Sequence, residues 1–274
     1  MRIEVIWAPN SRAGMTSAIA QYGENVVLLS NRKIGSRSRL LVGLDSKIQA
    51  TDTLELRDIK SVNHVVPPTM VREAKDYELI TNLVKNELAK IEEFIHIHPV
   101  SRWLFKCIND KLMAQIIDFC EFELDSKVLL TASSEQSELD KINNILSYCK
   151  SKPINFAGKF SLKQIAALNK KSKLFIGVDT AIMHISASND IPVFAFFGPS
   201  GANHWGPWDN DLIESGYTKN NGFQTMGRHR VFAESRRCQP CGQDGCDGTK
   251  ISNCLMEMDI DVIKTNIMAF THNN

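Results

Sequence analysis

The chain has 274 residues, of which 43% are hydrophobic and 23% are charged, and these proportions are ordinary for a globular protein. Its formal net charge of +1 gives no electrostatic reason to expect a nucleic-acid partner. No apolar run approaches the roughly 18 to 20 residues that a membrane-spanning helix needs. The N-terminus also lacks the basic and then apolar segments of a secretory signal. We therefore expect a cytoplasmic globular protein that does not bind nucleic acid.

The first 85 residues contain few predicted elements. Strands are expected at residues 3–7 and 26–29, with a helix of small residues at 16–22 between them. These elements make at most one βαβ unit, and a further helix is expected at about residues 73–89. This part is either an extension of the main sheet or, over residues 1–88, the remnant of a separate domain.

Strand-like and helix-like segments alternate from residue 94 onward. The expected strands are at 94–98, 128–131, 154–157, 174–178 and 193–197, and the expected helices at 108–122, 136–149, 162–170 and 181–189. Ser133 and Ser161 each stand three residues before a glutamine, which is the pattern of a capping box at a helix start. This alternation predicts an α/β fold, with a doubly wound parallel sheet over residues 89–274.

Polar residues gather directly after the predicted strands. The carboxyl ends of parallel strands meet at one edge of a sheet, where ligands bind near helix N-termini. A diphosphate at this edge would meet backbone N–H groups, hydroxyls and a lysine, and a carboxylate such as Glu135 would accept hydrogen bonds from a ribose. The alternative is that Ser133, Ser161 and Asp179 only cap helices. The candidate binding residues after these strands are Ser101, Arg102, Lys106, Glu135, Phe160, Asp179, Thr180 and His184.

Two further features each have two interpretations. His184 lies one helical turn after Thr180, so it is either a packed, hydrogen-bonded histidine or part of the site. The basic residues around 34–36 either form a solvated face or bind a phosphorylated or carboxylated acceptor, because guanidinium groups bind oxyanions through two hydrogen bonds. These basic residues are Arg32, Lys33, Arg37 and Arg39.

Four cysteines lie within 17 residues near the C-terminus, at Cys238, Cys241, Cys246 and Cys254. Four thiols among glycines and prolines suit a tetrahedral structural zinc. The second C-x2-C pair of a zinc ribbon is absent, however, since seven residues separate Cys246 from Cys254. Reduced packing thiols are the equal alternative, followed by a redox pair.

The sequence resembles glycosyltransferase family 9, the ADP-heptose:lipopolysaccharide heptosyltransferases. The resemblance is carried by VDTAIMH at 178–184, FGPS at 197–200 and WGP at 205–207. HPVSR at 98–102, FK at 105–106 and the cysteine-rich tail are most similar to the heptosyltransferase III-like branch. The resemblance is strong over about residues 90–260 and weak over the first 85. It implies a GT-B fold of two α/β domains, in which the C-terminal domain holds the sugar nucleotide.

The resemblance also implies an activity. Members of the family transfer heptose from ADP-heptose to the inner core of lipopolysaccharide, with inversion and without a metal or other cofactor, so peripheral contact with the inner membrane at its cytoplasmic face is expected. By position, Ser101 and Lys106 would contact the diphosphate, Glu135 the ribose, and Phe160 the adenine. Asp179, Thr180, Ala181 and His184 would line the diphosphate and sugar. The family usually has glycine in the place of Ala181.

The N-terminal part departs from the family pattern. The family opens with a strand leading into a Gly-Asp motif, whose aspartate serves as the base that deprotonates the acceptor. Neither occurs in this sequence, so we expect about 80 to 100 residues of the acceptor domain to be missing. Two other hypotheses follow. The chain is a sugar-nucleotide-binding remnant without chemistry, or it is an interaction module organised by zinc.

Overall fold

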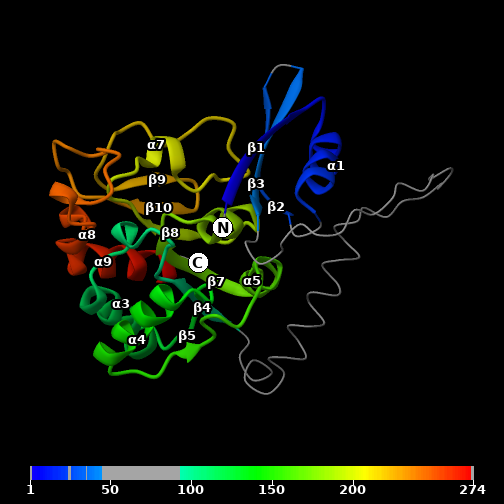
Figure 1. Ribbon diagram of the computed structural model, residues 1–274. Coiled ribbons are helices and arrows are strands. Elements are labelled where there is room, and N and C mark those ends of the chain that lie inside the picture. The colour runs from blue at the N-terminus through cyan, green and yellow to red at the C-terminus, as the bar shows by residue number, and fades with distance from the viewer. Residues whose placement is uncertain (1, 24–25, 35, 45–92, 273–274) are drawn as a thin grey trace. The chain divides into compact units, whose positions relative to one another are not determined.

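The computed structural model describes residues 2–23, 26–34, 36–44 and 93–272. Contacts divide the chain into two compact units (Figure 1). The first unit comprises Met1–Lys90 with Leu162–Leu168, and the second comprises Ile91–Ser161 with Asn169–Asn274. The predicted helix at about residues 73–89 lies outside the described residues.

The described N-terminal part of the first unit contains a three-stranded sheet and one helix, and Leu162–Leu168 add most of helix α5 (Leu162–Asn169) to the unit. In chain order its elements are β1 (Arg2–Ala8), α1 (Ser11–Tyr22), β2 (Val26–Ile34) and β3 (Arg37–Leu44). The sheet order is β1-β3-β2, and β3 is antiparallel to both of its neighbours. The two strands of the predicted βαβ unit are therefore separated by a third strand that the sequence analysis did not include.

A small apolar core holds this unit together. Asn10 caps α1 by accepting a hydrogen bond from the backbone N–H of Ala13 at 2.9 Å, which satisfies one of the free donors at a helix start. The helix packs closely on the sheet, since a β-carbon at Gly14 would lie 2.5 Å from a Leu40 methyl group. The buried core residues of this unit are Ile6, Ala18, Val26, Leu40 and Val42.

The second unit is built on a seven-stranded sheet of order β6-β5-β4-β7-β8-β10-β9. The five strands from β6 to β8 and the next strand, β10, are all parallel to their neighbours, whereas β9 is antiparallel to β10. The predicted parallel α/β sheet is confirmed, and the hairpin of β9 and β10 is an addition to it. The strand bounds are β4 (Phe94–His98), β5 (Lys127–Leu130), β6 (Ile154–Asn155), β7 (Ser172–Val178), β8 (Val193–Phe196), β9 (Gln224–Met226) and β10 (His229–Phe232).

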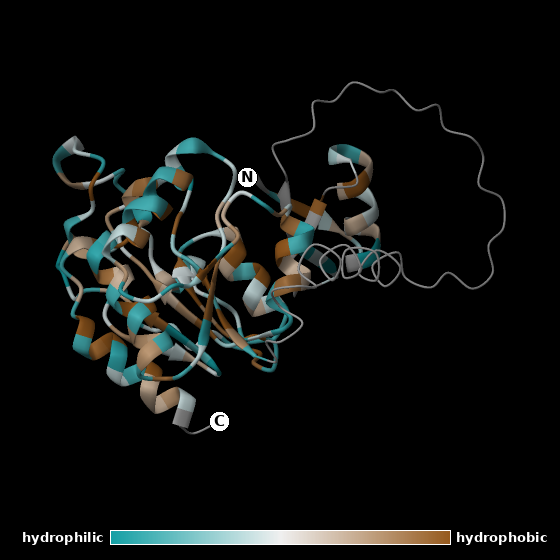
Figure 2. Cartoon of the chain, turned by 90° about the horizontal axis from the view of Figure 1, so that it is seen from below, coloured by the Kyte–Doolittle hydropathy of each residue, from teal (hydrophilic) through white to brown (hydrophobic). Residues whose placement is uncertain are grey.

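Helices cover both faces of this sheet, and its apolar strands lie between them (Figure 2). One face packs against α3 and α9, with Ile97, Ile176 and Phe194 in a shared core. On the opposite face α6 packs against β7 and β8. The helices of this unit are α3 (Asp110–Phe122), α4 (Gln136–Tyr148), α6 (Ala181–Ser188), α7 (Ala202–Trp205), α8 (Asn253–Met256) and α9 (Ile260–His272), with 3-10 turns η1 (Leu104–Lys106) and η2 (Cys246–Gly248).

The capping box predicted at Ser133 is wrong. Helix α4 begins at Gln136 with Glu135 in the cap position, and no side chain accepts a capping hydrogen bond there. Instead, the Ser133 hydroxyl accepts from the backbone N–H of Glu135 at 3.2 Å, and the Ser133 N–H donates to the buried carboxylate of Glu138 at 2.9 Å. The hydroxyl stabilises the turn before the helix rather than the helix itself.

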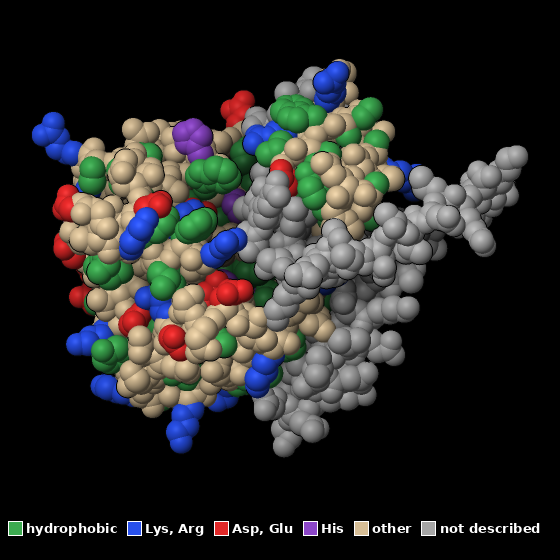
Figure 3. All heavy atoms as spheres, viewed as in Figure 1, with side chains coloured by type: hydrophobic (Ala, Val, Ile, Leu, Met, Phe, Trp, Pro, Cys, Tyr) green, Lys and Arg blue, Asp and Glu red, His purple; other side chains and the backbone are tan. Residues whose placement is uncertain are grey.

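The surface of the second unit carries mixed charges. On the face seen in Figure 3, lysine and arginine side chains are interspersed with aspartate and glutamate side chains around exposed apolar groups. None of the helices in the described part of the chain combines the length and the hydropathy that crossing a membrane requires.

Candidate functional site

Three side chains from three strand ends meet at the carboxyl edge of the second unit's sheet. The Lys106 Nζ and the Ser200 hydroxyl both donate to the same oxygen of Asp179, Oδ2, each at 2.6 Å. Only 8% of the Asp179 side chain is exposed, compared with 24% for Lys106. We call Lys106, Asp179 and Ser200 the edge cluster. Its charged carboxylate is paired and hydrogen-bonded, as a buried charge must be.

The strand order explains why residues so far apart in sequence meet. Lys106 follows β4, Asp179 follows β7 and Ser200 follows β8, and these strands are neighbours in that order. Strands β4 and β7 also approach closely near the edge, because a β-carbon at Gly177 would lie only 2.7 Å from the His98 carbonyl oxygen. The glycine therefore allows the two strand ends to lie side by side.

Thr180 begins α6 directly after Asp179. Its hydroxyl accepts a hydrogen bond from the Met183 N–H at 3.5 Å, as an N-cap residue does. The first turn of this helix therefore presents its backbone N–H groups at the same edge as Lys106. Free N–H groups and the positive end of the helix dipole favour an anion at such a position. Ala181, the first helical residue, is buried.

His184 lies one turn further along α6. Burial lowers the pKa of its imidazole, the Asp179 carboxylate raises it, and the Lys106 ammonium lowers it. The net effect is a lowered pKa, which keeps the ring neutral at neutral pH. The ring is thus electrostatically linked to Asp179 and Lys106 of the edge cluster, and its part in ligand binding stays a prediction.

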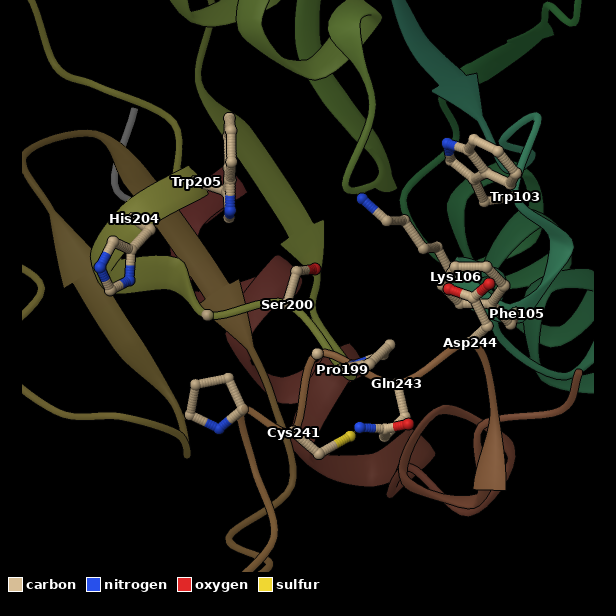
Figure 4. Close-up of a pocket in the computed structure, with 13 residues that line it drawn as sticks. Trp103, Phe105, Lys106, Pro199, Ser200, His204, Trp205, Cys241, Gln243 and Asp244 are labelled. Carbon is tan, nitrogen blue, oxygen red and sulfur yellow. The ribbon is translucent and has the colours of Figure 1, made fainter. Parts of the chain in front are cut away.

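A cavity of about 530 Å³ opens beside the edge cluster (Figure 4). Its walls come from three segments: residues 103–106 after β4, residues 199–205 after β8, and residues 240–244 of the cysteine-rich segment. In Figure 4 the Lys106 amine and the Ser200 hydroxyl point toward one another. The rings of Trp103 and Trp205 lie on opposite sides of the space in front of them. This volume is in the usual range for small-molecule sites.

A buried hydrogen-bond chain lies behind the site. The Asn169 amide donates to Nδ1 of His96 at 3.0 Å and to the Ser186 hydroxyl at 2.9 Å. Because Nδ1 of His96 accepts, its Nε2 carries the proton and donates to the Thr131 hydroxyl at 2.7 Å. The Thr131 hydroxyl in turn donates to Nδ1 of His98 at 2.9 Å. We call His96, His98, Thr131, Asn169 and Ser186 the histidine network.

The imidazoles of this network are neutral. Burial lowers the pKa of His96 to about 3, with a smaller contribution from His98, and burial lowers the pKa of His98 to about 3 as well. From the sequence, His96 was expected only as a strand residue, and His98 as a strand residue that begins the HPVSR motif of the resemblance. The signal that was missed was a pair of histidines at alternate positions of an otherwise apolar strand, since buried polar side chains need partners.

The other predicted binding residues lie along the same edge but outside the edge cluster. The buried Ser101 hydroxyl accepts from the Trp103 N–H at 3.2 Å. The exposed Arg102 guanidinium lies 5.5 Å from the centre of the Trp103 ring. Glu135 is exposed after β5, and the Phe160 ring lies 5.1 Å from the Phe156 ring after β6. Their contacts with a ligand stay predictions.

The basic residues proposed to bind the acceptor belong to the first unit. They lie on two paired strands, β2 and β3, with Arg32 opposite Arg39. Arg37 is exposed and Arg39 is half-buried on β3. The side chains of Arg32 and Lys33 are outside the described residues. Acceptor binding by this group stays a prediction.

The four C-terminal cysteines do not form a metal-binding group. Within the ranges that the structure describes, no three His, Cys, Asp or Glu side chains are placed to hold a metal ion, so the zinc alternative lacks support. Cys238 and Cys241 are exposed thiols, whereas Cys254 is buried, and burial raises its pKa to about 11.

This cysteine-rich segment is bound to the end of β8. The Gly242 N–H donates to the Pro199 carbonyl at 2.9 Å, and the Gln239 amide donates to the Gly198 carbonyl at 3.1 Å. The sequence analysis considered the segment only for its thiols and missed its place in the cavity wall. Trp205, in contrast, stood in a motif that was quoted for the resemblance, so a signal for it was present.

Comparisons with known proteins identify the family of the chain. The model of glycosyltransferase family 9 (heptosyltransferase) matches residues 66–231. Lipopolysaccharide heptosyltransferase 3 of Escherichia coli is 32% identical over 124 residues, which are 45% of this chain and 36% of that protein. Lipopolysaccharide core heptosyltransferase OpsX of Haemophilus influenzae is 31% identical over 94 residues, which are 34% of this chain and 27% of that protein.

Two solved structures share the fold. ADP-heptose lipopolysaccharide heptosyltransferase II of E. coli superposes with a TM-score of 0.52 at 17% identity, over 72% of this chain and 51% of that chain. A glycosyltransferase family 9 protein of Veillonella parvula gives a TM-score of 0.54 at 16% identity, over 74% of this chain and 52% of that chain.

The predicted GT-B-type α/β fold is thereby confirmed. The chain spans about a third of the length of the curated relatives it matches and about half of the solved structures. Because the family model matches more than half of the sequence, the chain belongs to glycosyltransferase family 9, the heptosyltransferases.

Proposed function

We propose that this chain takes part in the transfer of heptose from ADP-heptose to the inner core of lipopolysaccharide. Residues 89–274 would bind the sugar nucleotide, and residues 1–88 would belong to the acceptor side. The observation that carries the proposal is the edge cluster, where a lysine, a hydroxyl and a helix N-terminus meet beside a cavity. Family membership makes glycosyl transfer the reaction that this arrangement serves.

The nucleotide would lie along the strand ends. Phe160 follows β6, Glu135 follows β5, Lys106 follows β4 and Thr180 follows β7, and these strands are adjacent in that order. The adenine would therefore stack near Phe160, the ribose hydroxyls would donate to Glu135, and the diphosphate would lie between Lys106 and the start of α6. Ser101, Arg102 and Ala181 would border the diphosphate.

In the chemical step, ADP would leave with additional negative charge on its diphosphate. An acceptor hydroxyl would attack the anomeric carbon from the side opposite ADP, its C–O bond would form as the bond to the β-phosphate breaks, and a base would take the hydroxyl proton. The departing diphosphate would gain negative charge, which the Lys106 ammonium and the α6 N–H groups would stabilise. Neutral His184 would donate a hydrogen bond without adding charge.

The acceptor and its surroundings are also part of the proposal. Arg32, Lys33, Arg37 and Arg39 would bind anionic groups of the lipopolysaccharide core. Because that acceptor is membrane-anchored, the protein would work in the cytoplasm in peripheral contact with the inner membrane. The two curated relatives named above are lipopolysaccharide heptosyltransferases, which supports this acceptor class.

The test is calorimetric titration with ADP and ADP-heptose. It is followed by turnover assays with a lipopolysaccharide core that lacks the heptose to be added. Lys106→Ala should weaken ADP binding about tenfold or more, or about 1.4 kcal/mol, because it removes the cation beside the diphosphate. Lys264→Ala is the matched control, since Lys264 pairs with Glu123 at 3.5 Å on α9 and α3, and ADP affinity should not change.

Each outcome has a distinct meaning. Binding with turnover supports the transferase. Binding that depends on Lys106, without turnover on any heptose-accepting core, supports the alternative of a sugar-nucleotide-binding remnant. A chain that is folded but binds neither ADP nor ADP-heptose would refute the proposal.

A further inference from the structure

The cysteine-rich segment builds one wall of the cavity beside the edge cluster. Residues 240–244 line the cavity, and their backbone is joined to the end of β8 by the Gly242–Pro199 hydrogen bond. The Gln239 amide adds two hydrogen bonds to the carbonyls of Phe197 and Gly198, at 3.5 and 3.1 Å. This wall is therefore attached to the sheet at the point where Ser200 enters the edge cluster.

The strand order gives the cavity a position relative to a nucleotide. From β6 to β8 the sheet runs β6-β5-β4-β7-β8, and the residues proposed for base, ribose and diphosphate follow the first four of these strands. The cavity lies between the segment after β4 and the segment after β8, with Lys106 and Ser200 in its lining, so it extends from the proposed diphosphate position to the β8 end of the row. A nucleoside diphosphate sugar has the same linear order, with its sugar beyond the second phosphate.

The lining of the cavity suits a sugar. Trp103 and Trp205 are 52% and 44% exposed, and such rings offer apolar planar faces for the C–H face of a sugar ring. Gln243 and Asp244 add an amide and a carboxylate, which can bind hydroxyl groups in both donor and acceptor roles. Small-molecule sites commonly combine aromatic walls with a few placed polar groups in this way.

Asp244 is also held in place. Its carboxylate accepts from the Lys250 ammonium at 3.0 Å, and the same segment closes on itself through the Cys246 N–H and the Ile251 carbonyl at 2.7 Å. The carboxylate is 59% exposed and so is open to a ligand. A ligand hydroxyl that donates to the Asp244 carboxylate would replace a water molecule there. The carboxylate would stay paired with Lys250, so no unpaired charge would be buried.

We infer that this cavity binds the sugar of the nucleotide sugar, with Trp205 packing on the ring and with Gln243 and Asp244 of the cysteine-rich segment selecting its hydroxyl groups. This assignment rests on the proposed function, since it needs the nucleotide to lie along the strand ends. It gives the cysteine-rich segment a role in substrate specificity.

The experiment compares two ligands that differ only by the sugar. Titrations with ADP-heptose and with ADP are made for the original chain and for Trp205→Ala, Gln243→Ala and Asp244→Asn. Trp205→Ala should weaken ADP-heptose binding about tenfold, and the two polar variants about threefold to tenfold each, while ADP affinity stays within twofold. Asp247→Asn, a carboxylate of the same segment that does not line the cavity, is the matched control and should change neither affinity.

The outcomes separate this assignment from the proposed function. If ADP binds in a Lys106-dependent manner but the cavity variants weaken ADP and ADP-heptose equally, or weaken neither, the sugar assignment is wrong and the proposed function stands. Failure of both ligands to bind the folded chain overturns both. Thermal melting of each variant, expected within a few degrees of the original chain because these side chains are at the surface, excludes unfolding as the cause.

Discussion

Two polar clusters lie near one another in the second unit, and they differ in kind. The histidine network is neutral and buried, and its members satisfy one another in a fixed chain of donors and acceptors. The edge cluster is charged, partly exposed, and open to a cavity. Buried neutral networks specify packing, whereas a charged group at a cavity can exchange one partner for a ligand. We therefore assign the network to stability and the edge cluster to binding.

The largest expected effect is the loss of stability at low pH, which arises from the buried histidines. Burial lowers the pKa of His96 and of His98 to about 3 and the pKa of His229 to about 4, while the unfolded chain takes up these protons near pH 6.5. Stability should therefore be complete above pH 6.5 and fall as the pH drops toward 3 to 4. As the pH falls from 7 to 5, proton uptake by each of these imidazoles in the unfolded chain should lower the free energy of unfolding by about 1 to 2 kcal/mol.

Urea unfolding at a series of pH values measures this loss, and NMR of the imidazole carbons identifies its source. These rings should not titrate between pH 7 and 5 while the chain is folded. A midpoint near 6.5 for the signals assigned to His96 or His98 in the folded protein would show that the histidine network is not closed.

A smaller effect is expected from the hydroxyl at the centre of the histidine network. Thr131→Val keeps the shape of the side chain but leaves His96 and His98 without their shared partner. Because an unsatisfied buried donor or acceptor costs about 1 to 3 kcal/mol, unfolding free energy should fall by about 2 to 3 kcal/mol, with ADP affinity retained. Thr225→Val, at an exposed position on β9, is the matched control, and equal losses in the two variants would contradict the assignment.

The smallest effect concerns the corresponding hydroxyl of the edge cluster. Ser200→Ala removes one of the two hydrogen bonds to Asp179. Stability should change by no more than about 1 kcal/mol, whereas ADP-heptose affinity should fall by about threefold to tenfold, because Asp179, the partner of Lys106, loses one of the two hydrogen bonds that hold it in place. The comparison of the two clusters fails if this variant is destabilised as much as Thr131→Val and binds ADP-heptose normally.

The sequence predicted the parallel sheet well because its strands are apolar runs that are buried on both faces. It missed β9 and β10, short strands in which Gln224 and His229 stand among the apolar residues, and it also missed β3, although Leu40, Leu41 and Val42 form an apolar run there. The spacing of Ile260, Ile263 and Ile267 would have predicted α9. A local pattern also misplaced the cap of α4, since Glu138 rather than Gln136 bonds back to Ser133.

For the site, the sequence predicted which strand ends matter but not how they connect. Lys106 and Asp179 were both candidates, yet their ion pair depends on the adjacency of β4 and β7, which spacing alone does not encode. The joining of Gly242 to Pro199 is likewise a long-range contact. For that reason the cysteine-rich segment was considered for metal binding rather than as a cavity wall.

The spacing between the strands of the second unit's sheet also bears on the length of the ligand. Neighbouring strands lie about 4.8 Å apart, so the four steps from β6 to β8 span about 19 Å. A donor whose sugar is linked through a single phosphate would be too short to reach from the Phe160 end to Trp205, and one with a third phosphate would overshoot. With the nucleotide placed as proposed, the strand spacing set by backbone hydrogen bonding would select for the length of a diphosphate linkage before any side chain contacts the sugar.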